Sequence, residues 1–177
     1  MNWRECGTPR TCPFPGTGNN NINNSKRMGT KRPTNGKKAG ASYEAVFIAE
    51  AMKRGLVILE PRGDFLPYDV MVENRHGVVL KVQIKGTTYM QAGKRNTYKV
   101  IAAKGKTRSG KTPVTTEDAD VLAVYVAPVN SWYHIPTTHV SAVSINLRPA
   151  VPESKAQYEV WKDAWNVYEI KKKEQTT

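Results

Sequence analysis

Residues 78–85, which read Val-Val-Leu-Lys-Val-Gln-Ile-Lys, alternate almost strictly between apolar and polar side chains. Successive side chains of a β-strand point to opposite faces. One face is wholly apolar and should cover a core; its residues are Val78, Leu80, Val82 and Ile84. Gln83 and Lys85 lie on the opposite face. The pattern predicts a strand that presents an amide and an ammonium group side by side, two residues apart.

The chain just before this strand supplies a carboxylate. Pro67-Tyr68-Asp69 leads into a second strand, and residues 74–77, Asn-Arg-His-Gly, form a turn between the two strands. In such an antiparallel pair, Asp69 at the start of the first strand would lie within reach of Gln83 and Lys85. An acid, an amide and an ammonium group at one end of a hairpin predict a site where Mg²⁺ binds and a phosphate is attacked.

These residues resemble the motif of the PD-(D/E)XK nucleases, with Pro67-Tyr68-Asp69 followed by Gln83-Ile84-Lys85. Glu44, on a predicted helix introduced by a glycine, matches an additional acidic position of that family. The resemblance covers about residues 40–136 and is greatest to small single-domain members, namely Holliday-junction resolvases and group I intron homing endonucleases. It implies that Glu44, Asp69, Gln83 and Lys85 are the catalytic residues, and that Glu44, Asp69 and Gln83 hold Mg²⁺, for which Mn²⁺ can substitute.

The resemblance also implies an α/β fold of the restriction-endonuclease type. We expect a mixed, partly antiparallel central sheet of about five strands flanked by helices. Besides the two strands of the hairpin, the sequence predicts further strands at 56–60, 98–103, 121–127 and 132–135, and either a strand or an irregular edge at 141–147. Asp120 is expected to be a turn residue or the first residue of the strand that follows it; the alternative is that it supports the site without contacting the metal.

Gln83 occupies a position where the motif has Asp or Glu. Its carbonyl oxygen can coordinate a hard cation but carries no charge, so it should bind the metal more weakly. Some intron-encoded relatives resemble this chain in using Gln there, which favours an active site. The alternative is a DNA-binding protein whose nuclease site is degenerate and does not cut.

The helix that carries Glu44 is predicted to begin at Ser42, which can cap it, and to end at Gly55. Its inward stripe is predicted to consist of Ala45, Ile48, Ala49 and Met52. A carboxylate in the first turn is also favoured by the helix dipole alone. Asp64, in the turn before Asp69, is the second choice for the acidic ligand.

The charge of the chain points to a polyanionic partner. The 177 residues carry a formal net charge of +12, and no acidic residue occurs between Glu73 and Glu117. Such a balance favours DNA, branched or duplex, as the partner. The basic residues of this stretch that we expect to contact DNA are Lys94, Arg95, Lys104, Lys106, Arg108 and Lys111. Ser109-Gly-Lys-Thr112 is not a nucleotide-binding loop, because Lys106 stands where that motif requires its first glycine.

The sequence divides into three parts. Residues 1–38 are predicted to form a basic, disordered N-terminal arm with eight Lys or Arg residues against Glu5. This arm either follows DNA phosphates or only aids solubility. Residues 39–150 form the nuclease core. Residues 151–177 are predicted to be a helix whose aromatic stripe packs on the core or on a dimer partner; the stripe is Tyr158, Trp161, Trp165 and Tyr168.

These observations predict a Mg²⁺-dependent DNA endonuclease that acts as a homodimer or higher homo-oligomer. Its substrate is either a branched structure, as for a Holliday-junction resolvase, or a specific duplex sequence, as for an intron homing endonuclease. A restriction-type or repair nicking enzyme is a further alternative. No apolar run reaches the roughly 20 residues of a membrane-spanning helix, and the N-terminus has no apolar signal region. We therefore expect a cytoplasmic protein with no membrane partner. Cys6 and Cys12 lack two further ligands for a zinc site.

Overall fold

The computed structural model describes residues 36–63, 65–94, 96–104, 110–151 and 154–171. The chain divides into two units, Met1–Arg32 and Pro33–Thr177, and the described residues all belong to the second. The predicted basic arm lies outside the described residues except at 36–38, where the first helix has already begun. Among the described residues, no helix is both long enough and apolar enough to cross a membrane.

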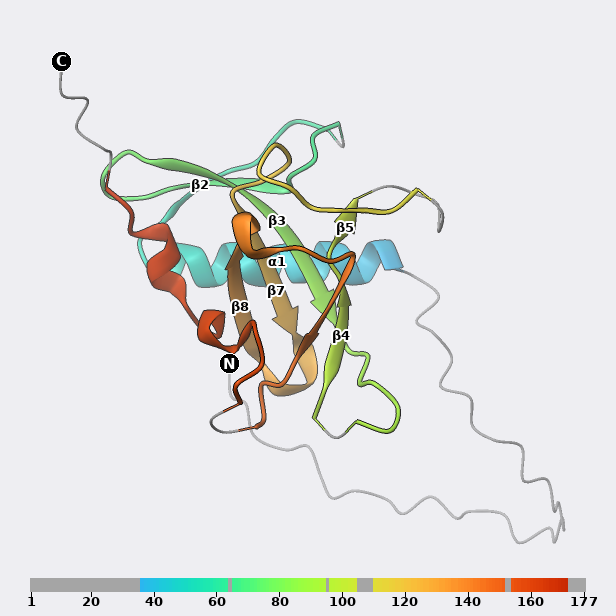
Figure 1. The fold of residues 1–177 in the computed structure, drawn as a ribbon. Coiled ribbons are helices and arrows are strands. Elements are labelled where there is room, and N and C mark those ends of the chain that lie inside the picture. Colours follow the sequence, from blue (N-terminus) through green and yellow to red (C-terminus); the bar gives the residue numbers. More distant parts are fainter. Residues whose placement is uncertain (1–35, 64, 95, 105–109, 152–153, 172–177) are drawn as a thin grey trace, which may run out of the picture. The chain divides into compact units, whose positions relative to one another are not determined.

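The centre of the fold is a mixed five-stranded sheet, which confirms the predicted α/β class (Figure 1). The strand order is β1-β2-β3-β7-β8, with β3 and β7 parallel and the other neighbours antiparallel. The strands are β1 (Val57–Leu59), β2 (Val70–Glu73), β3 (Val79–Thr87), β7 (Val121–Val126) and β8 (Ser131–Pro136).

Strand β3 has the alternation that its sequence predicts. Val82 and Ile84 are buried on the face that packs against helix α1 (Gly36–Lys53). The predicted turn between β2 and β3 is also present. The side chain of Asn74 accepts hydrogen bonds from the backbone N–H groups of His76 and Val78, and Gly77 takes the left-handed conformation with φ of 69°. Glycine adopts this conformation more readily than residues that carry a side chain.

Helix α1 differs from the prediction in its start and in its buried face. It begins at Gly36, so Ser42 lies inside it and donates a hydrogen bond to the carbonyl of Ala39 (2.7 Å) instead of capping the helix. The face turned to the sheet is formed by Tyr43, Phe47 and Ala51. The predicted stripe of Ala45, Ile48, Ala49 and Met52 is therefore wrong, since Ala45, Ala49 and Met52 are exposed and only Ile48 packs against the core. Gly55 ends the helix as predicted, with φ of 75°.

The opposite face of the sheet is covered by a β-ribbon and not by one of the predicted flanking helices. Strand β4 (Tyr98–Ile101) pairs with β9 (Ser144–Leu147), and their inward residues pack on Leu122 and Val124 of β7. The predicted strand 98–103 is split, because β5 (Ala103–Lys104) leaves β4 to pair with β6 (Thr112–Pro113). Short 3₁₀ turns follow β7 and β8, at η1 (Ala127–Val129) and η2 (Thr137–His139).

The predicted C-terminal α-helix does not form in the described part of residues 151–177. Residues 154–171, here called the C-terminal strap, contain only two 3₁₀ turns, η3 (Glu159–Trp161) and η4 (Trp165–Tyr168). Between them Asp163 has a positive φ of 50°, which breaks any helix. Its N–H donates to the carbonyl of Trp132 (2.7 Å), and its Oδ1 accepts from the N–H of Trp132 (3.1 Å). The strap thus runs along β8 and covers this edge of the sheet (Figure 1).

The aromatic residues of the strap are divided between the two sides of the sheet. Tyr158 and Trp161 pack with the β4–β9 ribbon, whereas Trp165 and Tyr168 pack with α1. The guanidinium group of Arg54 lies over the ring of Trp165, with its Cζ atom 4.2 Å from the centre of that ring. The strap therefore links both hydrophobic layers around the edge strand β8.

A fully buried histidine lies in the layer between the sheet and α1. Nδ1 of His134 is 3.0 Å from the hydroxyl of Tyr168, and Nε2 has no hydrogen-bond partner among the described residues. Burial, helped by the nearby Arg54 charge, lowers the pKa of His134 to about 3. The imidazole is therefore neutral in the folded protein at any pH near neutrality.

We predict that His134 makes stability depend on pH below neutrality. The unfolded chain protonates this histidine below a pKa of about 6.5, whereas the folded protein does so only at about 3. The free energy of unfolding should therefore fall as the pH is lowered from about 6.5 towards 3, by up to about 1.4 kcal/mol per pH unit. Urea unfolding at several pH values measures this slope.

The substitution His134→Gln should flatten the slope between about pH 4.5 and 6.5, whatever it does to stability at pH 7. The matched control is His76→Gln, because His76 is exposed and its loss should leave the slope unchanged. Equal slopes of unfolding free energy against pH for the wild type and His134→Gln would show that another group causes the pH dependence.

Candidate active site

Asp69 is fixed at the point where β2 and β3 begin to separate. Its N–H donates to the carbonyl of Val82 (2.9 Å), which extends the β2–β3 ladder by one residue. Its Oδ2 accepts hydrogen bonds from the N–H of Ile84 (2.6 Å) and from Nε2 of Gln83 (2.5 Å). Two donors on one oxygen hold the carboxylate in a single orientation. Oδ2 accepts both hydrogen bonds, so Oδ1 is the carboxylate oxygen that remains to bind a ligand.

Gln83 lies opposite Asp69 and is buried, with only 8% of its surface exposed. A buried amide must be paired to avoid a large desolvation cost. The bond to Asp69 meets this need through the amide nitrogen. The carbonyl oxygen Oε1 is consequently the Gln83 atom that can coordinate a cation.

Lys85 shares the strand face of Gln83, two residues further along β3. It is half-buried and belongs to none of the ion pairs formed by the described residues. Its ammonium group is therefore available to an external anion. The predicted trio thus consists of Asp69, directly before β2, and of Gln83 and Lys85 on the neighbouring strand β3.

Glu44 approaches from the other face of the sheet, on helix α1. The preceding residue, Tyr43, lies with its ring directly against the backbone of Gly86 on β3. This contact brings the turn of α1 that carries Glu44 against the segment of β3 just after Lys85. Glu44 is half-buried. Glu50, further along the same helix, pairs with Arg54 (2.7 Å) and Lys53 (2.9 Å), whose hydrogen bonds lower its pKa.

The oxygen donors of this site fit a hard divalent cation. Two carboxylates and an amide carbonyl are ligands of the kind that Mg²⁺ and Mn²⁺ take, with water completing the shell. Among the described residues, no three His, Cys, Asp or Glu side chains are arranged to hold a metal ion.

Two other acidic residues were considered for the site. Asp64, the second choice for the acidic ligand, lies outside the described residues. Asp120 has a structural role between β3 and β7. Its N–H donates to the carbonyl of Lys81 (2.9 Å), and its Oδ2 accepts from the N–H of Lys81 (2.8 Å). Asp120 thus fixes the start of β7 against β3.

The six basic residues predicted to contact DNA are only partly described. Arg95, Lys106 and Arg108 lie outside the described residues, whereas Lys94 and Lys111 are exposed. Lys104 is bound to the buried carboxylate of Asp118 (2.8 Å). Burial alone would raise the pKa of Asp118, but hydrogen bonds from Lys104 and Thr115 outweigh it and lower that pKa. Lys104 is therefore engaged in joining β5 to the turn at residues 115–118, which follows β6.

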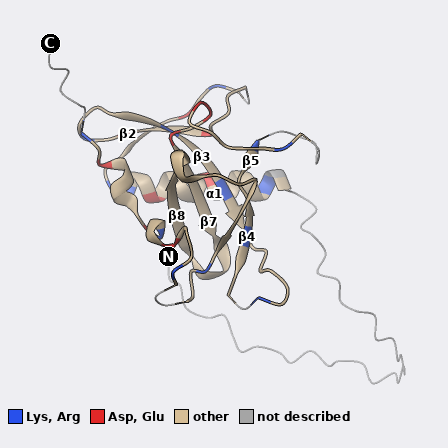
Figure 2. Cartoon of the chain, viewed as in Figure 1, with Lys and Arg blue, Asp and Glu red and all other residues tan. Residues whose placement is uncertain are grey.

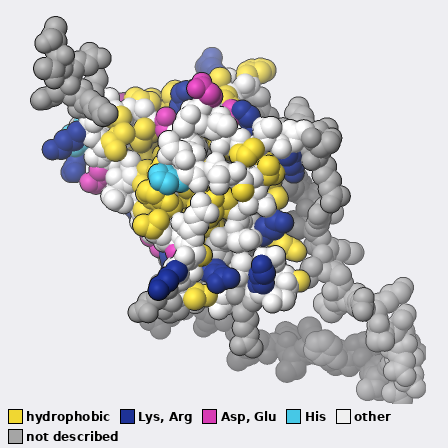
Figure 3. Space-filling model, viewed as in Figure 1, with side chains coloured by type: hydrophobic (Ala, Val, Ile, Leu, Met, Phe, Trp, Pro, Cys, Tyr) yellow, Lys and Arg dark blue, Asp and Glu magenta, His cyan; other side chains and the backbone are white. Residues whose placement is uncertain are grey.

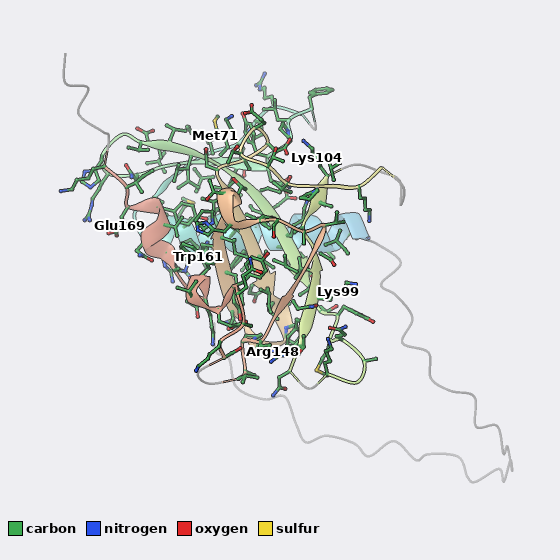
Figure 4. The ribbon with its side chains drawn as sticks, viewed as in Figure 1. Met71, Lys99, Lys104, Arg148, Trp161 and Glu169 are labelled. Carbon is green, nitrogen blue, oxygen red and sulfur yellow. The ribbon has the colours of Figure 1, made fainter. Side chains whose placement is uncertain are left out.

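Basic side chains that the sequence analysis did not single out lie on the β4–β9 ribbon and just after it. Lys99 is exposed on β4, and Arg148 directly follows β9. Both lie towards the same end of the molecule, away from Lys104 (Figure 4). Figure 2 shows a basic position on β4 and others in the turns at the lower end of this view, and Lys and Arg atoms lie along the lower and right-hand rim of this face (Figure 3). The basic surface thus extends beyond the predicted loop.

The sequence analysis also missed the contact between Tyr43 and Gly86. The available signal was a glycine inside a strand pattern, immediately after Lys85, since such a glycine often marks a close approach by another part of the chain. The partner in this contact could not be read from the sequence.

A mixed sheet with Asp69 at the start of one strand and Gln83-Ile84-Lys85 on the next defines a nuclease of the PD-(D/E)XK type. The model of the PD-(D/E)XK endonuclease family matches residues 34–168, and the chain belongs to this family. Among solved structures, the fold is similar to that of a bacterial homing endonuclease, I-Ssp6803I. The two share 24% sequence identity with a TM-score of 0.63, over 75% of this chain and 92% of that chain. No curated protein matches the chain.

We predict that Gln83→Glu makes the fold sensitive to metal. A glutamate cannot donate to Asp69, and two carboxylates in contact repel each other, so the metal-free protein should lose about 2 kcal/mol of stability at pH 7. Mg²⁺ should restore most of this loss, because the added charge strengthens cation binding. Thermal unfolding with EDTA and with Mg²⁺ measures both effects.

Gln83→Met is the matched control, because it removes the same hydrogen bond without adding charge. Its melting temperature should fall but should respond to Mg²⁺ less than that of Gln83→Glu. Equal responses of the two variants to Mg²⁺ would argue against a cation next to Gln83.

Proposed function

We propose that the protein is a Mg²⁺-dependent DNA endonuclease that hydrolyses phosphodiester bonds at the site formed by Glu44, Asp69, Gln83 and Lys85. One observation carries the proposal: the Asp69 carboxylate is held by Gln83 and Ile84 on the strand face that also presents Lys85. The family to which the chain belongs supports nuclease chemistry.

The residues divide the work of the reaction among them. Asp69, Gln83 and Glu44 would hold the cation, which when bound lowers the pKa of a water molecule and offsets the charge of the scissile phosphate. Lys85 orients the attacking water or stabilises the negative charge that grows on the phosphate. Water adds to phosphorus and the bond to the 3′ oxygen breaks, which leaves a 5′-phosphate and a 3′-hydroxyl.

The substrate that we favour is a specific duplex sequence. Gln83 in the acidic position of the motif resembles intron-encoded members of the family, and the structural neighbour I-Ssp6803I is a homing endonuclease. One site cuts one strand at a time, so a homodimer would supply one site for each strand of the duplex. The other candidate is branched DNA, which an enzyme recognises by shape rather than through base edges.

We predict that Asp69→Ala and Lys85→Ala each lower cleavage by at least about a thousandfold and leave DNA affinity within about threefold. Both side chains serve the chemical step, whereas affinity depends on basic residues elsewhere. Digestion of genomic DNA and of a labelled four-way junction with Mg²⁺ or Mn²⁺, together with a gel-shift assay in Ca²⁺, measures both quantities.

The matched control is Lys111→Ala, which removes an exposed cation outside the site and should act on affinity. Symmetric cuts near the branch point would identify a junction resolvase, and discrete fragments from genomic DNA would identify a sequence-specific enzyme. Full activity in both site variants would overturn the site assignment, and salt-dependent binding without cleavage in either metal would identify a non-catalytic binding protein.

A further inference from the structure

Gly86 occupies a position on β3 where no side chain fits. It follows Lys85 and is paired with Tyr125 of β7. A Cβ atom at this position would come within 2.5 Å of Cγ of Tyr43, and closer still to Cδ2 and Cε2 of the same ring. Real Cβ atoms essentially never approach other atoms closer than 3.0 Å. The φ angle of Gly86 is outside the left-handed region, so close approach, and not backbone conformation, requires the glycine.

The ring of Tyr43 also packs against a second aromatic ring of the sheet. Its centroid is 5.9 Å from that of Tyr125 in an edge-on arrangement. One turn further along α1, Phe47 is fully buried and packs edge-on against Trp132 at 5.5 Å. A Cβ at position 86 therefore cannot be accommodated unless the ring leaves Tyr125 or α1 moves away from β3.

We propose that Tyr43 and Gly86 are positioning residues that set the separation between α1 and β3 at the metal site. The inference rests on the proposed function, in which Glu44 is a metal ligand. Glu44 directly follows Tyr43 on α1, and Lys85 directly precedes Gly86 on β3. The contact therefore lies next to both Glu44 and Lys85, and it fixes the distance between β3 and α1, the helix that carries Glu44.

The size of the clash is large enough to affect such a site. Relief of the contact requires a shift of about 1 Å, and displacements of this size in a catalytic site cost large factors in rate. Residues that orient metal ligands typically contribute about tenfold to a hundredfold in metal affinity. Gly86→Ala should accordingly weaken metal binding by about tenfold.

The test measures Mn²⁺ binding to the metal-free full chain by electron paramagnetic resonance of the free ion, without DNA. Gly86→Ala should raise the Mn²⁺ dissociation constant about tenfold in the wild-type background, and less than about threefold in the Tyr43→Ala background, where the ring is gone. Gly40→Ala is the matched control. Gly40 lies on the same helix with nothing within 4 Å of its missing Cβ, so its replacement should leave the constant unchanged.

A second cycle shows whether the contact acts through Glu44. In a Glu44→Ala background, Gly86→Ala should have no further effect on Mn²⁺ affinity, which a general loss of stability would not reproduce. If Gly86→Ala does not fold, Tyr43→Ala should still weaken Mn²⁺ binding and Tyr43→Phe, which keeps the ring, should not.

The outcomes separate this inference from the proposed function. An equal loss of Mn²⁺ affinity from Gly86→Ala in the wild-type, Tyr43→Ala and Glu44→Ala backgrounds would overturn the inference. So would unchanged Mn²⁺ affinity in both Gly86→Ala and Tyr43→Ala. In either case, cleavage of DNA by the wild-type protein would still support the proposed function. A wild-type protein that neither binds Mn²⁺ nor cuts DNA would overturn both.

Discussion

Strand β3 must be an interior strand of a packed sheet and also carry the polar side chains of the site. It is paired on both sides, by β2 and β7, and its residues Val82 and Ile84 serve the hydrophobic layer beneath α1. On the other face Gln83 is buried, and an unpaired amide there would be costly. The carboxylate of Asp69 accepts from that amide. The hydrogen bond from Gln83 to Asp69 therefore both orients the carboxylate of the site and satisfies the amide that is buried with β3.

The parts of the structure that follow from local alternation could be predicted from the sequence. The period of two along residues 78–85 defines the two faces of β3, and the turn at Asn74–Gly77 fixes the register that brings Asp69 opposite Gln83. Both features depend on residues close together in the sequence. For the same reason the strands β7 and β8, which are short apolar runs, were predicted to within a residue or two at each end.

The parts that depend on distant segments could not be predicted in this way. Residues 45–49 of α1 are nearly all apolar, so the periodicity does not define one buried face, and the choice of Tyr43 and Phe47 is made by the shape of the sheet. The aromatic spacing of residues 158–168 fits a helix but arises from a segment that crosses an edge strand. The ion pair of Lys104 with Asp118 depends on the pairing of β5 with β6.

The C-terminal strap has a consequence for how the chain folds as it is made. Every strand of the sheet is synthesised before residues 154–171, yet Tyr158 and Tyr168 complete the two layers on its opposite faces. Until the strap emerges from the ribosome, β8 is an uncovered edge strand, and each hydrophobic layer lacks the tyrosine that the strap contributes to it. Nascent chains that stall before this point would expose an unpaired strand, which is a template for aggregation. Completion of the fold is thus coupled to translation of residues 154–171.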